Sequence, residues 1–258
     1  MNIPDSKIAV TLYNLRDYCR DEKGLLETLR KVRAIGYEAV QISGIGDIPA
    51  SRVRSCLDET GLYCCATHEG LAAFLEKPDE TIEKLKTYNC TFSAIGGPGN
   101  EYFREGGAEE LAEKLNGIGA RFLDAGIRFG YHNHDGEFEK FSDGTFMDVL
   151  FARSDAKTVC FEIDTHWVQR GGANPAAWVR KSAGRIPVLH IKDFSMIGRD
   201  PVFSEIGEGN LEWSEIFAAA EESGVRWYSV EQDKPFKDRN IFDSMEISFK
   251  NLRAMGVQ

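Results

Sequence analysis

The sequence predicts an α/β protein built as a single (β/α)8 barrel, one domain that extends over residues 1–258. Short apolar runs alternate with longer amphipathic runs, and this alternation indicates eight strand–helix pairs without a linker between them. Several helix-like runs end at a glycine just before the next apolar run, as at Gly36, Gly61, Gly126 and Gly224. Eight such units in a chain of 258 residues match the usual size of this barrel.

The first half of the chain contains four of these units. Each strand is a short apolar run, and each helix is a longer run with apolar residues at helical spacing. The longest helix shows this spacing in Leu111, Leu115, Ile118 and Phe122. We expect strands at Ile8–Tyr13, Ala39–Ser43, Leu62–Thr67 and Cys90–Ile95, and helices at Gly24–Ile35, Ile48–Thr60, Lys77–Tyr88 and Ala108–Ala125.

The second half repeats the pattern and closes the chain with a helix. An open sheet with a dinucleotide-binding loop is the structural alternative, but no G-x-G-x-x-G segment follows the first predicted strand. We expect strands at Ile127–Asn133, Val159–Ile163, Val188–Ile191 and Trp227–Val230, and helices at Thr145–Arg153, Pro175–Ala183, Trp213–Ser223 and Phe242–Met255.

Charge and composition exclude several classes of partner. The formal net charge of −10 repels a phosphate backbone, so we expect no nucleic-acid partner. The N-terminal residues show neither a secretory signal nor an apolar run long enough for a membrane span. The six cysteines form no C-x-x-C pair, so we expect free thiols, a cytoplasmic location and no membrane partner.

Metal-binding residue types follow four consecutive predicted strands. Active sites of such barrels lie where strands run into their following loops, and four of the five histidines stand there. Imidazole and carboxylate ligands together suit Mn²⁺, Co²⁺, Fe²⁺ or Zn²⁺, and suit Mg²⁺ less well. The four strand ends read Tyr131-His132-Asn133-His134, Glu162-Ile163-Asp164-Thr165-His166-Trp167, His190-Ile191-Lys192-Asp193 and Glu231-Gln232-Asp233.

The same segments resemble the xylose isomerase-like barrel superfamily, and within it the sugar phosphate isomerase/epimerase family with a Tyr-His-Asn-His motif. The resemblance extends over nearly the whole chain. It is most specific in GYHNHDGEF, EIDTHW, LHIKD and VEQD, and IGEGNLEW, Ile206–Trp213, is a further similar segment. It implies one divalent metal ion, held by side chains that follow strands five to eight.

The resemblance implies a set of metal ligands. Asp164, His190 and Glu231 match the family pattern directly. The first ligand of the family is usually a glutamate, whereas this chain has His132 at that position and His134 two residues later. The choice between these two histidines stays open at this point.

The ligand set also indicates a chemistry. A metal that chelates the carbonyl and hydroxyl oxygens of a ketose makes the neighbouring C–H acidic, so that a carboxylate can remove its proton and leave a stabilised enediolate. We expect Glu231 to be this base as well as a ligand. Glu137 and His134 are candidates to return the proton, and Lys192, which shares a strand face with His190, is a candidate to bind substrate or steady its charge.

Three further residues are candidate substrate contacts. The family often has a substrate-binding histidine where this chain has His68. Glu162 shares a strand face with Asp164 and is positioned to orient a ligand. Trp167 follows Asp164 by three residues and is a candidate wall against one face of a sugar.

These observations favour a metal-dependent sugar isomerase or epimerase that acts on a small ketose, a keto-sugar or an inositol-derived ketone. A keto-sugar dehydratase or lyase of the same superfamily is an alternative. A non-catalytic sugar-binding barrel is another, and it would not require a base beside a metal. A DNA-repair endonuclease of the endonuclease IV type is disfavoured by the acidic charge. The oligomeric state is open, because the ring of helices could support a homo-oligomer.

Overall fold

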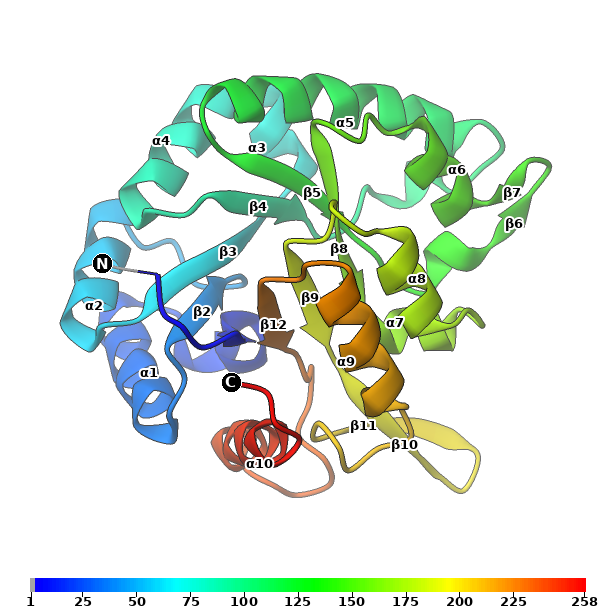
Figure 1. Cartoon of the computed structure of the whole chain (residues 1–258). Helices are drawn as coiled ribbons and strands as arrows, with labels where there is room; N and C mark the ends of the chain where they lie inside the picture. The colour runs from blue at the N-terminus through cyan, green and yellow to red at the C-terminus, as the bar shows by residue number, and fades with distance from the viewer. Residues whose placement is uncertain (1–2) are drawn as a thin grey trace.

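Eight parallel strands close into a barrel with a ring of helices outside it (Figure 1). The computed structural model describes residues 3–258. The barrel strands pair in the order β1, β2, β3, β4, β5, β8, β9 and β12, and β12 pairs with β1 to complete the circle. The predicted (β/α)8 fold is therefore confirmed. The strands are β1 Ile8–Thr11, β2 Ala39–Ile42, β3 Tyr63–Glu69, β4 Phe92–Ile95, β5 Arg128–His132, β8 Val159–Asp164, β9 Val188–Ile191 and β12 Trp227–Val230.

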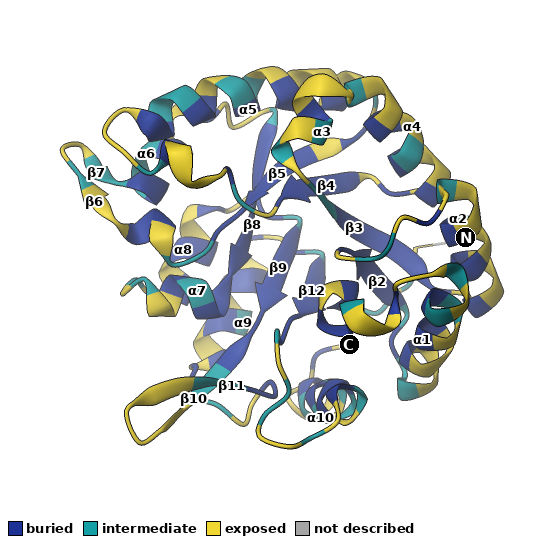
Figure 2. Cartoon of the chain, turned by 180° about the vertical axis from the view of Figure 1, so that it is seen from behind, coloured by how far each residue is buried: buried dark blue, intermediate teal, exposed yellow. Residues whose placement is uncertain are grey.

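The helices cover the outside of the barrel and turn their buried faces toward it (Figure 2). Several begin at the residues that favour a helix start: Asp21, Thr145, Asn174 and Asn240 each accept a hydrogen bond from a backbone N–H of the first turn. The helices are α1 Glu22–Ile35, α2 Ala50–Thr60, α3 Leu71–Glu76, α4 Pro78–Tyr88, α5 Gly107–Asp124, α6 Phe146–Arg153, α7 Thr165–Arg170, α8 Pro175–Lys181, α9 Trp213–Glu222 and α10 Ile241–Ala254.

The structure differs from the expected elements where the chain turns at the carboxyl end of the barrel. The first strand ends at Thr11 rather than Tyr13, because Thr11 caps a 3-10 helix at Leu12–Tyr18. Helices α3 and α7 directly follow their strands, although their six residues are too few to show a helical period. Four short strands also form two hairpins, β6 Lys140–Phe141 with β7 Gly144–Thr145 and β10 Asp193–Ile197 with β11 Asp200–Ser204.

Two separate apolar cores follow from the alternation of side chains along the strands. The larger core lies between the barrel and the helices. The smaller core contains inward-facing residues of the strands, and it fills the lower part of the barrel with small side chains and a few aromatic rings. The rings of Tyr63 and Trp227 stack there with centroids 5.6 Å apart. The smaller core contains Ala9, Ala39, Tyr63, Cys65, Ala66, Phe92, Ala94, Cys160, Val188 and Trp227.

Helix α5 approaches the chain before β8 so closely that a glycine is required at the contact. A Cβ atom on Gly119 would lie 2.6 Å from the backbone oxygen of Thr158. We expect Gly119→Ala to lower the free energy of unfolding by about 1–3 kcal/mol, the usual cost of overpacking. Gly117 in the same helix has open space around its Cα, so Gly117→Ala is the matched control and should stabilise by about 0.5–1 kcal/mol. Urea denaturation measures both, and equal stabilities of the two variants would contradict the expectation.

The structure also describes the cysteines and the apolar character of the helices. All six cysteines are buried and carry free thiols. In the part of the chain from residue 3 onward, no helix combines the length and the apolar character that crossing a membrane requires.

Candidate functional site

The inward-facing side chains of four neighbouring strands form layers at the carboxyl end of the barrel. In the sheet register, His132 of β5 lies beside Glu162 of β8, and Asp164 lies beside His190 of β9. Two residues further along each strand, the next side chain on the same face stands one layer higher. On β8, Glu162 therefore lies one layer below Asp164. We call the side chains around Glu162 the lower layer, and the group that contains Asp164 and Glu231 the upper group. His190, level with Asp164 in the register, contacts both Glu162 and Glu231.

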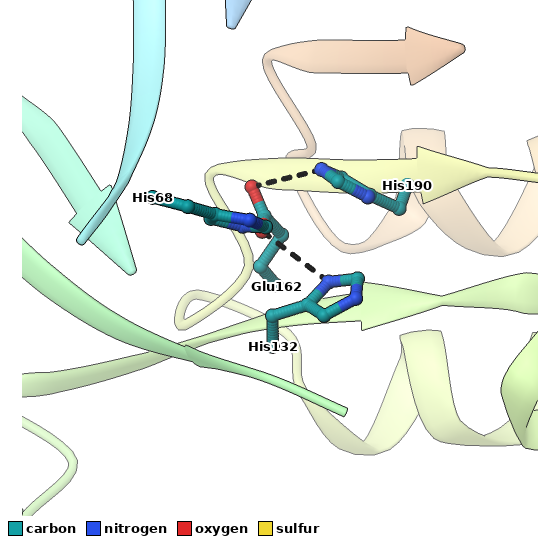
Figure 3. A group of neighbouring side chains, drawn as sticks. All are labelled: His68, His132, Glu162 and His190. Carbon is teal, nitrogen blue, oxygen red and sulfur yellow. Dashed lines mark hydrogen bonds and ion pairs between the residues drawn. The ribbon is translucent and has the colours of Figure 1, made fainter. Parts of the chain in front are cut away.

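The lower layer gathers three imidazole rings around one carboxyl group (Figure 3). Glu162 Oε2 contacts His68 Nε2 and lies 3.4 Å from His132 Nδ1, and Glu162 Oε1 lies 3.3 Å from His190 Nε2. Glu162 is completely buried, so these imidazoles replace the water that a carboxylate would otherwise bind. The close packing of these rings also makes His68 a neighbour of His132, with centroids 5.0 Å apart.

The upper group shares two histidines with the lower one. One ligand atom from each of His132, Asp164, His190 and Glu231 lies within 4.8 Å of all the others. His190 links the two layers, because its Nδ1 lies 2.6 Å from Glu231 Oε2 while its Nε2 lies 2.7 Å from Gln41 Oε1. These four residues are the set that the family resemblance implies, with His132 rather than His134 in the group.

Burial and charge determine the protonation of these groups. Burial lowers the pKa of His132 to about 3, so its ring is neutral near pH 7. Burial alone would raise the pKa of Glu162 and Glu231. At Glu162, the charges of His190 and His68 outweigh burial and hold its pKa well below the usual range. At Glu231, the charges of Lys192 and His190 do the same. Neutral His132 and ionised Glu162 and Glu231 are in the forms that bind metal ions, whereas the same two carboxylates, outweighing burial, raise the pKa of His190 well above its usual range.

Several buried polar atoms of the cluster have no hydrogen-bond partner among the described residues. They are His132 Nδ1, Glu162 Oε1 and Asp164 Oδ2. A buried polar atom without a partner costs free energy, and burial accordingly raises the pKa of Asp164 well above its usual range. A divalent cation would satisfy such atoms, so the side chains present fit a metal ion.

Lys192 lies inside the barrel, as its strand position predicts. Its Nζ is 2.8 Å from Asp233 Oδ2 and 3.9 Å from Glu231 Oε2. The same atom lies 4.6 Å from the centre of the Trp167 ring and 4.9 Å from that of Phe203, which adds cation–π attraction. Lys192 is only 1% exposed, so its ammonium group is not on the surface.

Asp193 instead organises the loop that contains IGEGNLEW. Its carboxylate accepts hydrogen bonds from the backbone N–H groups of Gly207, Gly209 and Leu211, and from the indole N–H of Trp213 at 2.7 Å. Asp193 is completely buried, so this network fixes the path of the chain after the hairpin. The motif is therefore a structural feature of the seventh strand's loop.

Glu137 makes its hydrogen bonds within its own part of the chain. Its Oε1 accepts a hydrogen bond from the Tyr131 hydroxyl at 2.7 Å, and its Oε2 accepts one from the His134 backbone N–H at 2.9 Å. The side chain is buried and is absent from the lining of the pocket above the cluster. In this structure Glu137 holds the loop that carries His134, and proton transfer by Glu137 stays a prediction.

A pocket of about 580 Å³ opens above the ligand cluster. It contains the predicted substrate contacts His68, His134, Trp167 and Lys192, and it exposes part of His132 and Glu231. Glu69 and Asp233 also line it, and the sequence analysis did not single them out. Glu69 is the last residue of β3 and Asp233 lies three residues after β12, so the strand-end argument could have included them. The remaining lining residues are Tyr13, Ser43, Gly44, Gly70, Gly96 and Gly97.

His166 is a strand-end histidine that lies outside both the cluster and the pocket above it. It falls within helix α7, where its ring packs edge-on against Trp167 and Phe194, with centroids 4.6 and 5.0 Å apart. Burial lowers the pKa of His166 to about 3. A short helix after β8 thus separates His166 from Asp164, although only one residue lies between them in the sequence.

Comparison with known proteins shows a family match over most of the chain. The family described as the xylose isomerase-like TIM barrel matches residues 29–250. The curated relatives include inosose dehydratase of Clostridium beijerinckii, 29% identical over 161 residues, which are 56% of this chain and 53% of the relative. Inosose dehydratase of Clostridium botulinum is 26% identical over 168 residues, or 59% of this chain and 55% of the relative. The match spans about half the length of these relatives.

Solved structures superimpose on nearly the whole of this chain. A sugar phosphate isomerase/epimerase from Parabacteroides distasonis superimposes with a TM-score of 0.84 at 24% identity, covering 99% of this chain and 96% of the other. L-ribulose 3-epimerase superimposes with a TM-score of 0.73 at 15% identity, covering 98% and 94%. At these identities the likeness shows the fold alone.

Proposed function

Because this chain belongs to the xylose isomerase-like TIM barrel family, we propose that it is a divalent-metal-dependent enzyme that removes a proton beside the carbonyl of a small keto-sugar or cyclic polyol ketone. His132, Asp164, His190 and Glu231 would hold the metal ion. One observation carries the proposal: Glu231 belongs to the ligand group and also lines the pocket. A carboxylate in that position can reach both a cation and a bound ketone.

The metal ion would supply Lewis acidity to the carbonyl oxygen of the substrate. The chain supplies the proton transfers. Glu231 accepts the proton from the carbon next to the carbonyl, and its low pKa keeps it ionised for this purpose. Lys192, 3.9 Å from Glu231, contributes a positive charge close to the carbon that becomes electron-rich.

The step after proton removal decides between elimination and epimerisation. We favour elimination of water: the C–H electron pair becomes a new C=C bond, the β C–O bond breaks, and a proton donor converts the leaving hydroxide into water. His134 lines the pocket outside the ligand group, which makes it the candidate donor. The curated relatives named inosose dehydratase support this choice.

Epimerisation or isomerisation is the second candidate, and one observation favours it. Glu69 lines the pocket from β3, across the barrel from β9 and away from Glu231 on β12. A second carboxylate on another wall could return the proton to the opposite face of the substrate carbon. Glu69 is held by Lys84 at 2.9 Å, so this role would require it to keep that ion pair while it contacts substrate.

Proton NMR in D₂O separates these outcomes on inosose and on a panel of unphosphorylated ketoses. We expect the Mn²⁺-loaded protein to exchange the hydrogen beside the carbonyl and to release water. Chelator-treated protein should do neither. A new stereoisomer with retained hydroxyl groups would favour epimerisation instead. Unchanged ligand affinity after metal removal, with no exchange, would indicate a sugar-binding barrel and contradict an enzymatic function.

A further inference from the structure

The pocket carries more negative than positive charge. Glu69, Glu231 and Asp233 line it, whereas Lys192 is its single lysine or arginine. The charges of these four side chains sum to −2, and a bound divalent cation would bring that sum to about zero. A phosphorylated sugar adds a dianion or monoanion, which needs cations or backbone N–H groups that are not already paired.

Lys192 does not provide such a cation. Its ammonium group lies 2.8 Å from Asp233 and between the rings of Trp167 and Phe203, and the residue is 1% exposed. A phosphate could reach Lys192 only if it displaced Asp233, and the carboxylate would then be left beside the phosphate. The charge of Lys192 is therefore used within the protein.

Several backbone N–H groups in the region that binds phosphate in many barrels are also used. Those barrels hold phosphate with the loops after strands seven and eight and a short helix N-terminus. Here the N–H groups of Gly207, Gly209 and Leu211 in the loop after strand seven donate to Asp193. In the short helix after β8, which is the sixth strand of the barrel, the Trp167 N–H donates to Asp164.

The arginines beside the pocket are likewise engaged. A second cavity, next to Asp233, contains Arg16 and Arg239. Arg16 donates to the backbone oxygens of Tyr13 and Asp233, at 2.6 and 3.3 Å, and Arg239 pairs with Glu205 and Glu208 at 2.7 and 2.9 Å. Neither guanidinium lines the main pocket.

The remaining features of the pocket suit neutral hydroxyl groups. The carboxylates of Glu69 and Asp233 are strong acceptors for neighbouring hydroxyls, and Trp167 and Tyr13 offer aromatic faces to C–H groups. Building on the proposed function, we propose that the substrate is an uncharged polyhydroxylated ketone and that the corresponding phosphate ester is rejected. Among the substrates that the names of similar proteins suggest, the proposal selects unphosphorylated sugars and excludes sugar phosphates.

Matched pairs of ligands test this inference with the Mn²⁺-loaded protein. Calorimetry would compare D-fructose with D-fructose 6-phosphate, D-ribulose with D-ribulose 5-phosphate, and inosose with inorganic phosphate. We expect each uncharged ketone to bind at least tenfold more tightly than its phosphorylated partner, and we expect inosose to bind more tightly than phosphate. Tighter binding of the esters, or no binding of any uncharged ketone, would overturn the inference.

The outcomes distinguish a failure of this inference from a failure of the proposed function. The binding preference stands even if no ligand shows hydrogen exchange in D₂O, in which case only the enzymatic proposal fails. Exchange with phosphorylated ketoses alone would preserve the enzymatic proposal and overturn the substrate class. Arg16→Ala and Lys234→Ala, at the neighbouring cavity, should leave the preference unchanged; loss of ester binding in either variant would reveal a phosphate site there and overturn the inference.

Discussion

Replacing Glu231 by glutamine is expected to lower the rate of proton removal beside the ketone by about 10³-fold at saturating metal. Glutamine keeps the size of the side chain but cannot accept the proton. It also weakens one ligand position and the contact with His190 Nδ1, which is 2.6 Å in the native chain. Exchange of the substrate hydrogen for deuterium, followed by NMR, measures the loss.

A surface glutamate provides the control for this variant. Glu208 pairs with Arg239 at 2.9 Å outside the pocket, so Glu208→Gln should keep the native exchange rate within about twofold. A rate for Glu231→Gln within tenfold of the native rate would assign the base to another residue. Glu69 and Asp233, which share the pocket, would then be the next carboxylates to replace.

Replacing Glu162 by glutamine is expected to weaken Mn²⁺ binding by about 10–100-fold, the usual effect of losing a carboxylate that orients histidine ligands. Glu162 lies 3.4 Å from His132 and 3.3 Å from His190, so one carboxylate contacts both histidines of the upper group. Titration with Mn²⁺, followed by electron paramagnetic resonance, measures the affinity and also reports a changed ligand field.

Ser229 offers a buried control in the same layer of the barrel. It lies beside His190 in the sheet register, and its hydroxyl has no hydrogen-bond partner among the described residues. Ser229→Ala should keep the native affinity for Mn²⁺ within about twofold. If Glu162→Gln binds Mn²⁺ as the native protein does, Glu162 acts only in packing, and its ion pairs with the histidines do not position the ligands.

The barrel and the ligand cluster could be predicted because both depend on simple periods. Alternation along a strand places Glu162 with Asp164 and His190 with Lys192 on the inner face, and the structure has all four there. Parallel strands bring their carboxyl ends to one rim, so His132 and Glu231 join the group although 99 residues separate them in the sequence. Neither inference requires knowledge of the loops.

The features that the sequence did not reveal depend on loop conformation. Glu137 follows a strand in the sequence, but a 3-10 turn at Gly136–Phe138 directs its carboxylate toward Tyr131. Helix α7 likewise places His166 away from Asp164, although only one residue lies between them in the sequence. Short turns of three to six residues have no repeating pattern, so composition and spacing could not predict them.

The aromatic and alanine layer at the lower end of the barrel has a consequence for turnover. The stacked rings of Tyr63 and Trp227, packed with Phe92, close the lumen beneath the histidines. Molecules would then enter and depart through the pocket at the opposite end. A product that retains the substrate's hydroxyl groups must leave by the entrance that the next molecule needs, so accumulated product is expected to compete and to slow the reaction.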